Sequence, residues 1–354
     1  DMAVLRASIC DASVVLASAT PSLESWANAK SGKYERFDLT QRFGVAELPD
    51  MKSIDLRGDE LETGRWISKT LTREVFKRLE RGEQSLLFLN RRGYAPVTVC
   101  RACGFQIGCE DCDARMVEHR FQGRLMCHQC GETKPIVKTC PSCGIEGKLA
   151  AIGPGIERLA EEAEMRFEGA KISVLSSDMH LTTRSLKERI ISIANGEADI
   201  IIGTQLVAKG HNFPLLTCVG VIDADLGLQG SDLRAAERTF QLIRQVSGRA
   251  GRVDKKGTAF IQTLQPEHPV IQAILSGEEE KFWAAEADQR ERAGVPPYGR
   301  MAGVVVSGPD LAQVSDLARY MVHNAEPLHR INAEIFGPAP APIARVRGRH
   351  RVRI

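Results

Sequence analysis

Eight of the ten cysteines in this sequence of 354 residues lie in a single stretch between Cys100 and Cys143. They form four C-x-x-C pairs, which are Cys100/Cys103, Cys109/Cys112, Cys127/Cys130 and Cys140/Cys143. A C-x-x-C turn places two thiolates on one side of a tight loop, so two turns supply the tetrahedral four-sulfur shell of a structural zinc site. In three of the pairs a glycine follows the second cysteine, where a positive φ turns backbone N–H groups toward the sulfurs. The sequence therefore predicts two zinc ions per chain.

The spacing of the pairs favours one way of sharing the two ions. Five residues separate Cys103 from Cys109, which is short for a hairpin between two cysteine turns, whereas fourteen separate Cys112 from Cys127. We therefore expect a nested arrangement, with the inner pairs on one ion and the outer pairs on the other, although spacing leaves the other two pairings open. The competing chemistries are disulfides, which need an oxidising compartment that no secretory segment here indicates, and a redox site, which would use one C-x-x-C pair.

Apart from the cysteines, the composition is that of an ordinary globular protein, with 43% apolar and 26% charged residues. The length allows two or three domains, and no apolar run approaches the length of a membrane span. The formal net charge is +2, but eight thiolates on two Zn²⁺ ions subtract four charges and leave the metallated chain near −2. A surface that binds nucleic acid would therefore be a local basic patch.

Short apolar strands alternate with helical segments through most of the chain. Strands are expected at 85–89, 171–175, 199–203, 218–222 and 258–263, and helices at about 155–167, 183–194 and 233–246. Strands that are apolar throughout and alternate with helices are typical of a parallel sheet covered on both faces. We therefore predict an α/β fold with one RecA-like lobe, formed by 71–98 and 148–265, and with the cysteine-rich stretch 99–147 inserted after its first strand.

The segment before this lobe also carries a recognisable pattern. Residues 12–17 are an apolar run that predicts a short buried strand, and Ser18, Ala19 and Thr20 follow it directly. Small hydroxyl residues at the carboxyl end of a strand occupy the position where α/β sheets bind ligands, although a helix N-cap would explain them too. Residues 45–65 are mixed and polar, with Pro49 and Gly58, and are expected to be a linker.

The last part of the chain is expected to be a small α+β domain, with strands at 301–307 and 333–336 and a helix at 311–323. Its end carries an arginine at every second position, namely Arg345, Arg347, Arg349, Arg351 and Arg353. On one strand this spacing would place five guanidinium groups on one face, which predicts contact with phosphate groups. A solvated edge strand protected against aggregation is the alternative.

The string with the most specific chemistry is QVSGRAGR, from Gln245 to Arg252. Arg249 and Arg252 lie three residues apart at the end of a predicted helix and are spaced by glycines. From there they can reach out of one lobe to a triphosphate bound by another and neutralise the charge that develops on the γ-phosphate. A basic helix C-terminus stabilised by the helix dipole would explain one arginine but not the whole string.

This string resembles the sixth motif of superfamily 2 helicases, Q-x-x-G-R-x-G-R. Gly203-Thr204 with Lys209-Gly210 resembles the fifth motif, and Ser18-Ala19-Thr20 resembles the third. Together with the eight-cysteine insertion and the strings SATPSLESW, FLNRRGYAP, GTQLVAKGHNFP and DLRAAERTFQL, these motifs are similar to the PriA family of replication-restart helicases over the whole chain.

The resemblance implies a bacterial, ATP-driven 3′-to-5′ DNA helicase that recognises stalled or abandoned replication forks and initiates primosome assembly. Its implied partners are forked DNA, primosome proteins, single-stranded DNA-binding protein and the replicative helicase with its loader, in the bacterial cytoplasm at the nucleoid. ATP and Mg²⁺ would serve the full-length enzyme, beside two Zn²⁺ ions held in the nested pairing that the family shares. The implied domains are the end of helicase lobe 1 (1–45), a linker (46–70), lobe 2 around the zinc insertion, a helical connector (266–294) and a C-terminal DNA-binding domain (295–354).

The resemblance also implies roles for individual residues. Arg249 and Arg252 would be arginine fingers, and Gln245 would contact the nucleotide region. The residues that would couple ATP hydrolysis to unwinding are Ser18, Thr20, Gly203, Asp225 and Gly248. The DNA-contacting residues would be Thr204, Lys209, Arg91, Arg92, Arg345, Arg347, Arg349 and Arg351. Whether Arg91 and Arg92 bind phosphate or pair with carboxylates stays open.

Two motifs of the family are absent from these 354 residues, the G-x-x-x-x-G-K-[ST] phosphate loop and the DExH motif. We therefore interpret the chain as an internal or C-terminal fragment, which on its own would neither bind ATP tightly nor hydrolyse it. Two other interpretations are a different superfamily 2 translocase with an unrelated zinc insertion, and a non-catalytic zinc-ribbon scaffold that binds nucleic acid.

Overall fold

The computed structural model describes residues 2–39, 48–59, 61–62, 64–90, 97–100, 102–119, 123–152, 155–176, 182–208, 213–228, 232–252 and 255–354; the side chains of 97, 119, 150–152 and 252 lie outside the description. The chain divides into two compact units. The first comprises Asp1–Asn90 and Arg166–Arg300, and the second comprises Arg91–Met165 and Met301–Ile354. Each unit is therefore assembled from two stretches that are distant in the sequence.

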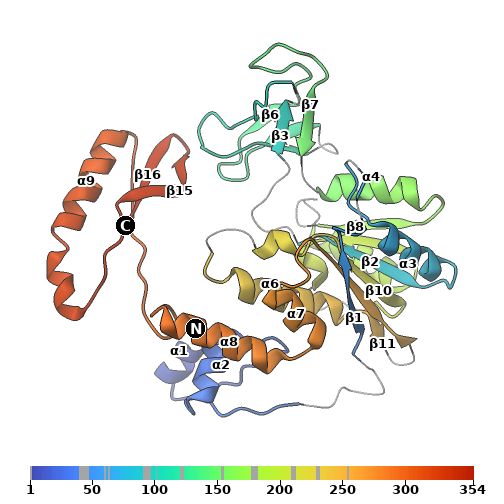
Figure 1. Ribbon diagram of the computed structural model, residues 1–354, viewed down its shortest axis with the longest axis horizontal. Helices are drawn as coiled ribbons and strands as arrows, with labels where there is room; N and C mark the ends of the chain where they lie inside the picture. Colours follow the sequence, from blue (N-terminus) through green and yellow to red (C-terminus); the bar gives the residue numbers. More distant parts are fainter. Residues whose placement is uncertain are drawn as a thin grey trace. The chain divides into compact units, whose positions relative to one another are not determined.

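The first unit is built on a six-stranded parallel sheet in the order β1-β13-β10-β2-β9-β8 (Figure 1). Its strands are β1 (Asp50–Asp55), β13 (Thr258–Thr263), β10 (Leu216–Val221), β2 (Gln84–Phe88), β9 (Ile200–Gly203) and β8 (Ile172–Leu175). Every residue of β2, β9 and β10 is buried, as is typical of central strands covered on both faces. The predicted parallel α/β sheet is confirmed.

Helices cover both faces of this sheet. The helices of the first unit are α1 (Met2–Ile9), α2 (Leu23–Lys30), α3 (Lys69–Leu79), α5 (Thr183–Ala194), α6 (Ala235–Ser247), α7 (Pro269–Ser276) and α8 (Glu279–Arg292), with the 3₁₀ helices η3 (Gln205–Ala208) and η4 (Asp225–Leu228). A Cβ on Gly220 of β10 would meet the side chain of Leu71 in α3 at 2.7 Å, whereas Val219 and Val221 belong to the core that contains Phe240 of α6. Because neighbouring residues of a strand point to opposite faces, α3 and α6 lie on opposite sides of the sheet.

Three further elements are the helix α4 (Ile156–Arg166) and the two-residue strands β11 (Gly251–Arg252) and β12 (Lys255–Lys256). Helix α4 ends at the boundary between the units, and β11 pairs with β12 directly before β13. None of the helices in the described ranges is both long and apolar enough to span a lipid bilayer.

Two expectations for the N-terminal part are wrong. Residues 12–17 form no strand, and Val15 is 89% exposed, because no strand in the described part of the chain lies beside this run to pair with its backbone. The stretch 45–65, expected to be a linker, contains strand β1, whose Ile54 pairs with Gln262 of β13. Strand β1 is an edge strand in which one residue of six, Ile54, is buried, which explains why its composition is polar.

The second unit contains two small folded parts. The cysteine-rich stretch forms the strands β3 (Val97–Cys100), β4 (Val117–His119), β5 (Arg124–Met126), β6 (Thr133–Pro135) and β7 (Leu149–Ile152). The C-terminal stretch forms β14 (Val305–Gly308), α9 (Leu311–His323), the 3₁₀ helix η5 (Glu326–Ile331), β15 (Ala339–Val346) and β16 (Arg349–Arg353). Its antiparallel sheet has the order β14-β16-β15, and Val306 and Val352 pack with Val314 and Ala318 of α9.

The arginine-rich end is a hairpin and not a single strand. Arg347 and Gly348 have φ angles of 51° and 71°, as in the tight turns that join two antiparallel strands. In the register of the hairpin, Arg345 of β15 lies opposite His350 of β16. Alternation along β16 then places three arginines on the face opposite to that of Arg345 and His350, namely Arg349, Arg351 and Arg353. The prediction of one common arginine face is wrong, because the chain reverses in the middle of the run.

The expected strand at 333–336 is also absent. Helix η5 ends at Ile331, and Asn332 adopts a φ of 56°, so the chain turns at this point. Strand pairing begins only at Ala339, where β15 meets β16. The proline–alanine run at 338–342 therefore lies mostly in an edge strand, a position that tolerates proline because one side of the strand needs no donor.

Candidate zinc centres and motif residues

Two sets of four cysteines gather in the second unit. Zinc site 1 consists of Cys100, Cys103, Cys140 and Cys143, and zinc site 2 consists of Cys109, Cys112, Cys127 and Cys130; within each set the sulfurs lie within 4.8 Å of one another. Three of these sulfur–sulfur distances are 3.6 to 3.7 Å. A tetrahedral shell with Zn–S bonds of about 2.3 Å has edges of about 3.8 Å, so the sulfurs fit Zn²⁺. The nested pairing is confirmed, and the disulfide alternative is excluded because S–S bonds measure about 2.05 Å.

Three of the four cysteine turns share one backbone pattern. The N–H of the first cysteine donates to the carbonyl five residues further on, and the glycine after the second cysteine donates its N–H to the carbonyl of the first. These glycines are Gly104, Gly131 and Gly144, with φ angles between 70° and 84°. The turn at Cys109 keeps the first of these bonds, to Ala114, but has Asp113 at the position of the glycine.

Backbone donors and burial act on the thiols in opposite directions. The N–H of Cys143 lowers the pKa of Cys140 to about 7, because it hydrogen-bonds to the thiolate. Burial raises the pKa of Cys109, in zinc site 2, to about 12. Zinc binds the thiolate form, so the protons of such groups must leave when the ion binds, and the affinity for zinc falls as the pH falls.

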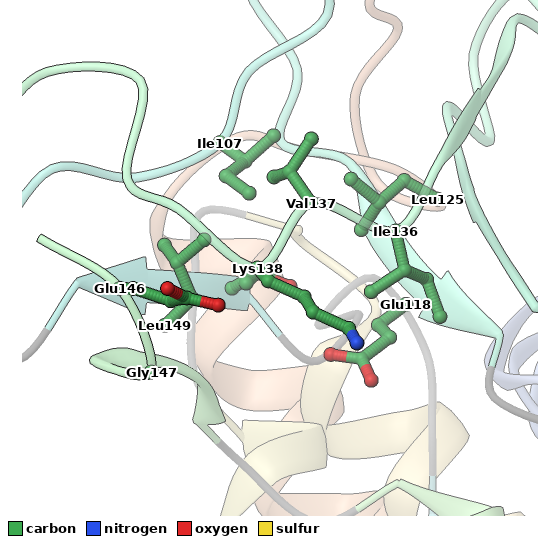
Figure 2. Close-up of a pocket in the computed structure, with 10 residues that line it drawn as sticks. Ile107, Glu118, Leu125, Ile136, Val137, Lys138, Glu146, Gly147 and Leu149 are labelled. Carbon is green, nitrogen blue, oxygen red and sulfur yellow. The ribbon is translucent and has the colours of Figure 1, made fainter. Parts of the chain in front are cut away.

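A cavity of about 260 Å³ lies within the cysteine-rich stretch (Figure 2). Half of its lining residues are apolar, namely Ile107, Leu125, Ile136, Val137 and Leu149. Figure 2 shows the Lys138 side chain extending toward Glu118. The hydroxyl of Thr98 also lines the cavity, is buried, and has no hydrogen-bond partner among the residues that the structure describes. All of its lining residues lie between Thr98 and Leu149 in the sequence.

In the first unit, residues of the third and sixth motifs contact each other. Gln245 of α6 donates from Nε2 to Oγ1 of Thr20 over 2.7 Å, and the N–H of Thr20 donates to Oγ of Ser18 over 3.1 Å. One turn earlier on α6, Gln241 donates to the carbonyl of Pro21 over 2.7 Å. The structure therefore brings Ser18, Thr20 and Gln245 together, and it adds Gln241, which sequence reasoning missed.

A buried ion pair, also missed, anchors the same segment. Glu237 and Arg290 are 3.1 Å apart, and each side chain is only 2% exposed. Glu237 also accepts the N–H of Leu23 over 3.2 Å, at the start of α2. Three polar side chains thus recur at every fourth residue on one side of α6, and all of them hold residues 20–23; they are Glu237, Gln241 and Gln245. This polar row on a largely buried helix is the signal that could have revealed the contact.

The fifth motif and the end of the sixth are also adjacent. Arg249, just after α6, donates to the carbonyl of Ala208 over 2.6 Å, and Gly248 caps the helix. Gly203 closes β9 at a point where a Cβ would come within 2.3 Å of Val207, and Thr204 beside it is buried. The predicted site residues that lie outside the described residues are Lys209, Arg91, Arg92 and the side chain of Arg252.

Asp225 lies at the carboxyl end of β10, where α/β sheets form their binding sites. It is buried, and its carboxylate accepts from the N–H of Leu264 over 2.6 Å and from the hydroxyl of Thr263. These bonds tie the loop after β10 to the end of β13. Two residues earlier, burial raises the pKa of the Asp223 carboxyl, which accepts the N–H of Leu226 over 2.9 Å.

The C-terminal arginines have two different surroundings. Arg345 turns to the cysteine-rich stretch, where its guanidinium donates to the carbonyl of Glu110 over 2.8 Å and lies 3.5 Å from the carboxylate of Asp113. Arg349 and Arg351 instead donate to backbone carbonyls of their own sheet. The structure therefore separates Arg345 from the arginine face of β16.

Three family models match the C-terminal stretch, the cysteine-rich stretch and the lobe with the helicase motifs. Residues 291–354 match the family model of the primosomal protein N C-terminal domain, and residues 109–135 match that of the PriA DNA helicase Cys-rich region (CRR) domain. The chain contains PriA-family domains. Residues 145–254 match the helicase conserved C-terminal domain. The PriA match within the cysteine-rich stretch contradicts the interpretation of an unrelated zinc insertion.

Relatives that align with almost the whole of this chain carry the same family name. The chain is 41% identical to replication restart protein PriA of Rickettsia conorii, over 100% of this chain and 54% of the relative. It is 39% identical to replication restart protein PriA of Bacillus subtilis, over 99% of this chain and 44% of the relative. The chain therefore spans about half the length of these curated relatives. Among solved structures, S. cerevisiae Dbp5 bound to RNA and ADP BeF3 aligns with 80% of this chain and 54% of its own, with 15% identity and a TM-score of 0.38.

Proposed function

We propose that this chain is the part of a replication-restart DNA helicase that comprises the second motor lobe, the zinc module and the C-terminal domain. The helicase would use ATP and Mg²⁺ to move 3′ to 5′, would recognise stalled or abandoned forks, and would initiate the primosome assembly that loads the replicative helicase. The observation that carries this proposal is the pair of nested four-cysteine sites, in a stretch that matches the PriA cysteine-rich region. In the sequence, this stretch is inserted between β2 and β8, two strands of the same parallel sheet.

In the motor, we assign the sixth motif to the nucleotide. Arg249 and Arg252 would reach a triphosphate bound by the other lobe and stabilise charge on its γ-phosphate. Gln245 would serve the same region, and its bond to Thr20 supports a coupling between that region and the third motif. Ser18, Thr20, Gly203, Asp225 and Gly248 would transmit the state of the nucleotide to the DNA.

On the DNA side, Thr204 and Lys209 after β9, together with Arg91 and Arg92 after β2, would contact the strand backbone. The arginines of the C-terminal hairpin would add a second basic surface, of which β16 supplies the face with Arg349, Arg351 and Arg353. Primosome proteins, single-stranded DNA-binding protein and the replicative helicase with its loader would be the protein partners.

Fork recognition can be tested with the zinc-loaded chain itself. Fluorescence anisotropy would compare a labelled fork with a linear duplex of the same sequence and length, at one fixed salt concentration, because affinities for DNA depend strongly on salt. We expect tighter binding to the fork. Equal affinity for the two DNAs would contradict fork recognition.

The catalytic assignment needs a protein in which this chain follows a complete nucleotide-binding lobe. There, Arg249→Lys should lower the DNA-stimulated kcat for ATP by about 10³-fold or more, as is typical when an arginine finger is lost. Arg238→Lys, an exposed change on the same helix, is the matched control. A 3′-tailed duplex should be unwound and a 5′-tailed duplex should not.

The chain alone should not hydrolyse ATP. Its 354 residues contain neither a G-x-x-x-x-G-K-[ST] phosphate loop nor a DExH motif for Mg²⁺. A coupled-enzyme assay with saturating single-stranded DNA would measure this. ATPase activity above background from the purified chain would contradict the assignment of this chain to the second lobe only.

A further inference from the structure

The cysteine turn at Cys109 differs from the other three in its hydrogen bonds as well as in its sequence. In the other turns the glycine after the second cysteine returns its N–H to the first cysteine of the same turn. Asp113 occupies that position here, and its N–H donates instead to the carbonyl of Arg345 in the C-terminal hairpin, over 2.9 Å. One of the two bonds that usually close such a turn is therefore made to a residue far away in the sequence.

The sulfur of the second cysteine in this turn also has a distant donor. In two of the other turns, Cys130 and Cys143 accept the N–H of the residue two positions further on. The sulfur of Cys112 accepts the N–H of Arg347 over 3.3 Å. The hairpin thus supplies to Cys112 the kind of donor that these cysteines receive from their own turns.

Further contacts hold the hairpin tip on the same turn. The N–H of Gly348 donates to the carbonyl of Asp111 over 2.8 Å, and the guanidinium of Arg345 donates to the carbonyl of Glu110 over 2.8 Å. Val346 packs against the apolar cluster that surrounds zinc site 2. Backbone donors, a backbone acceptor, a guanidinium and an apolar side chain all meet one turn, so the contact is specific in its geometry.

We propose that the tip of the C-terminal hairpin, residues 345–348, is the outer shell of zinc site 2. The N–H of Arg347 stabilises the thiolate of Cys112, and the carbonyl of Arg345 takes the N–H that a glycine would otherwise direct back into the turn. Zinc binding at site 2 and docking of the C-terminal domain therefore stabilise each other, and the size of the effect is the same in both directions.

Zinc site 1 provides the internal comparison. Both of its turns contain the glycine, Gly104 and Gly144, and both make the internal glycine bond. Its Cys103 is exposed, whereas Cys109, Cys112 and Cys127 of zinc site 2 are buried. Site 1 should therefore bind its ion independently of the hairpin. The linkage does not rest on the proposed helicase activity, so the two can fail separately.

The first test measures zinc release from the zinc-loaded full chain. An excess of a chromogenic chelator removes the ions, and alkylation by N-ethylmaleimide followed by peptide mass spectrometry shows which four cysteines have lost protection. Arg345→Ala should accelerate loss from site 2 by about tenfold, the lower end of the range for lost outer-shell partners, and leave site 1 unchanged. The matched control is Arg349→Ala on the same hairpin, whose guanidinium contacts Ser307 within its own sheet and should change neither rate.

A rescue variant separates this proposal from a general loss of stability. Asp113→Gly, combined with Arg345→Ala, gives the Cys109 turn the glycine that the other three possess. This double variant should release zinc from site 2 at close to the original rate. Equal release from Arg345→Ala and the unchanged chain, equal acceleration at both sites, or failure of the rescue would each overturn the proposal.

The second test measures the linkage in the opposite direction. Cys112→Ser removes a ligand of site 2, and Cys103→Ser removes a ligand of site 1. In hydrogen-exchange mass spectrometry, the peptide that covers 339–354 should exchange faster in Cys112→Ser and be unchanged in Cys103→Ser. Unchanged protection of this peptide in both variants would overturn the proposal.

Discussion

Thr20 and Gln245 are joined by a hydrogen bond of 2.7 Å between the threonine hydroxyl and the glutamine amide, although 225 positions separate them in the sequence. Gln245 is the last member of the polar row on α6, after Glu237 and Gln241, and all three hold residues 20–23. The helix that carries this row ends in the arginine string. The polar row therefore ties residues 20–23 to the helix that leads into the arginine string.

The bond between Thr20 and Gln245 should be measurable as a coupling energy. We expect Thr20→Val and Gln245→Leu to destabilise the first unit less than additively when combined, with a coupling of about 1 kcal/mol, the usual net value of such a bond. Urea unfolding of both single variants and the double variant measures it. Thr20→Val with Gln272→Leu, whose amide donates to Pro266 instead, should be additive. Additivity in both pairs would contradict the prediction.

The ion pair between Glu237 and Arg290 should contribute far more when it is broken on one side. Arg290→Met leaves the Glu237 carboxylate buried without its partner, which typically costs about 3–5 kcal/mol of unfolding free energy. Arg292→Met, two residues further along α8, breaks only an exposed pair with Asp288 and should cost less than about 1 kcal/mol. Chemical denaturation at neutral pH compares the two. Similar losses from both changes would show that burial of the pair is unimportant.

Asp223 should make the first unit more stable at lower pH, within the range where zinc stays bound. Burial raises the pKa of its folded-state carboxyl above the ordinary value of about 3.9. Its contribution is therefore fully present below about 3.9 and is lost as the pH rises through the raised folded value. Asp223→Asn should gain stability relative to the unchanged chain between pH 4 and pH 7. Asp55→Asn is the opposite control, because Arg57 lowers the pKa of Asp55. A constant difference across this range would contradict the prediction.

The zinc content should be two ions per chain, and each four-cysteine set should account for one. Cys127→Ser should therefore retain one ion, as measured by elemental mass spectrometry, and leave unfolding of the first unit unchanged because its core contains none of these ligands. Cys218→Ser is the matched control, since Cys218 is buried in β10 and is not a ligand; it should retain both ions and destabilise the sheet. In the complete helicase, Cys127→Ser should impair unwinding more than DNA-stimulated ATPase.

The exposed face of β16 should contribute to DNA affinity through charge. Arg349→Glu combined with Arg353→Glu should weaken binding at moderate salt and reduce the slope of log K against log salt by about 0.9 for each lost phosphate contact on duplex DNA. The control changes Arg319 and Arg330, two exposed arginines of α9 and η5, to glutamate. Titration by fluorescence anisotropy at several salt concentrations separates the two doubles. Identical slopes for the two double variants would show that the hairpin arginines make no specific phosphate contacts.

Some of the fold could be predicted because its signals are local. Strand β13 at 258–263 and helices α5 and α9 have the predicted bounds, since their apolar pattern lies within the elements and the capping residues of the two helices directly flank them. The run 12–17 has an equally apolar pattern and forms no strand. An apolar run becomes a strand only if another strand lies beside it, and that is decided by the rest of the fold.

The same distinction holds for the candidate sites. The four C-x-x-C pairs were sufficient to predict two zinc ions, and the length of chain between them favoured the nested pairing because chain length restricts which turns can meet. Spacing left the other two pairings open, and the positions of the sulfurs in the folded chain decided between them. The row formed by Glu237, Gln241 and Gln245 could be seen on the helix but not assigned a partner. Hydrogen-bond donors and acceptors act over about 3 Å, and spacing along the chain does not say which distant group comes that close.

The hairpin shows this limit most clearly. The alternation of arginines with other residues at the end of the chain can be read directly from the sequence, as can Asp113 at the position where the other cysteine turns have glycine. The reversal of the chain at Arg347 and Gly348 is visible only in the folded protein, where Arg345 contacts the zinc module and other arginines stay on β16. The hydrogen bond from the N–H of Arg347 to the sulfur of Cys112 is likewise visible only in the folded protein. The physical reason is that local geometry follows from neighbouring residues, whereas the partner of a backbone N–H follows from its position in space.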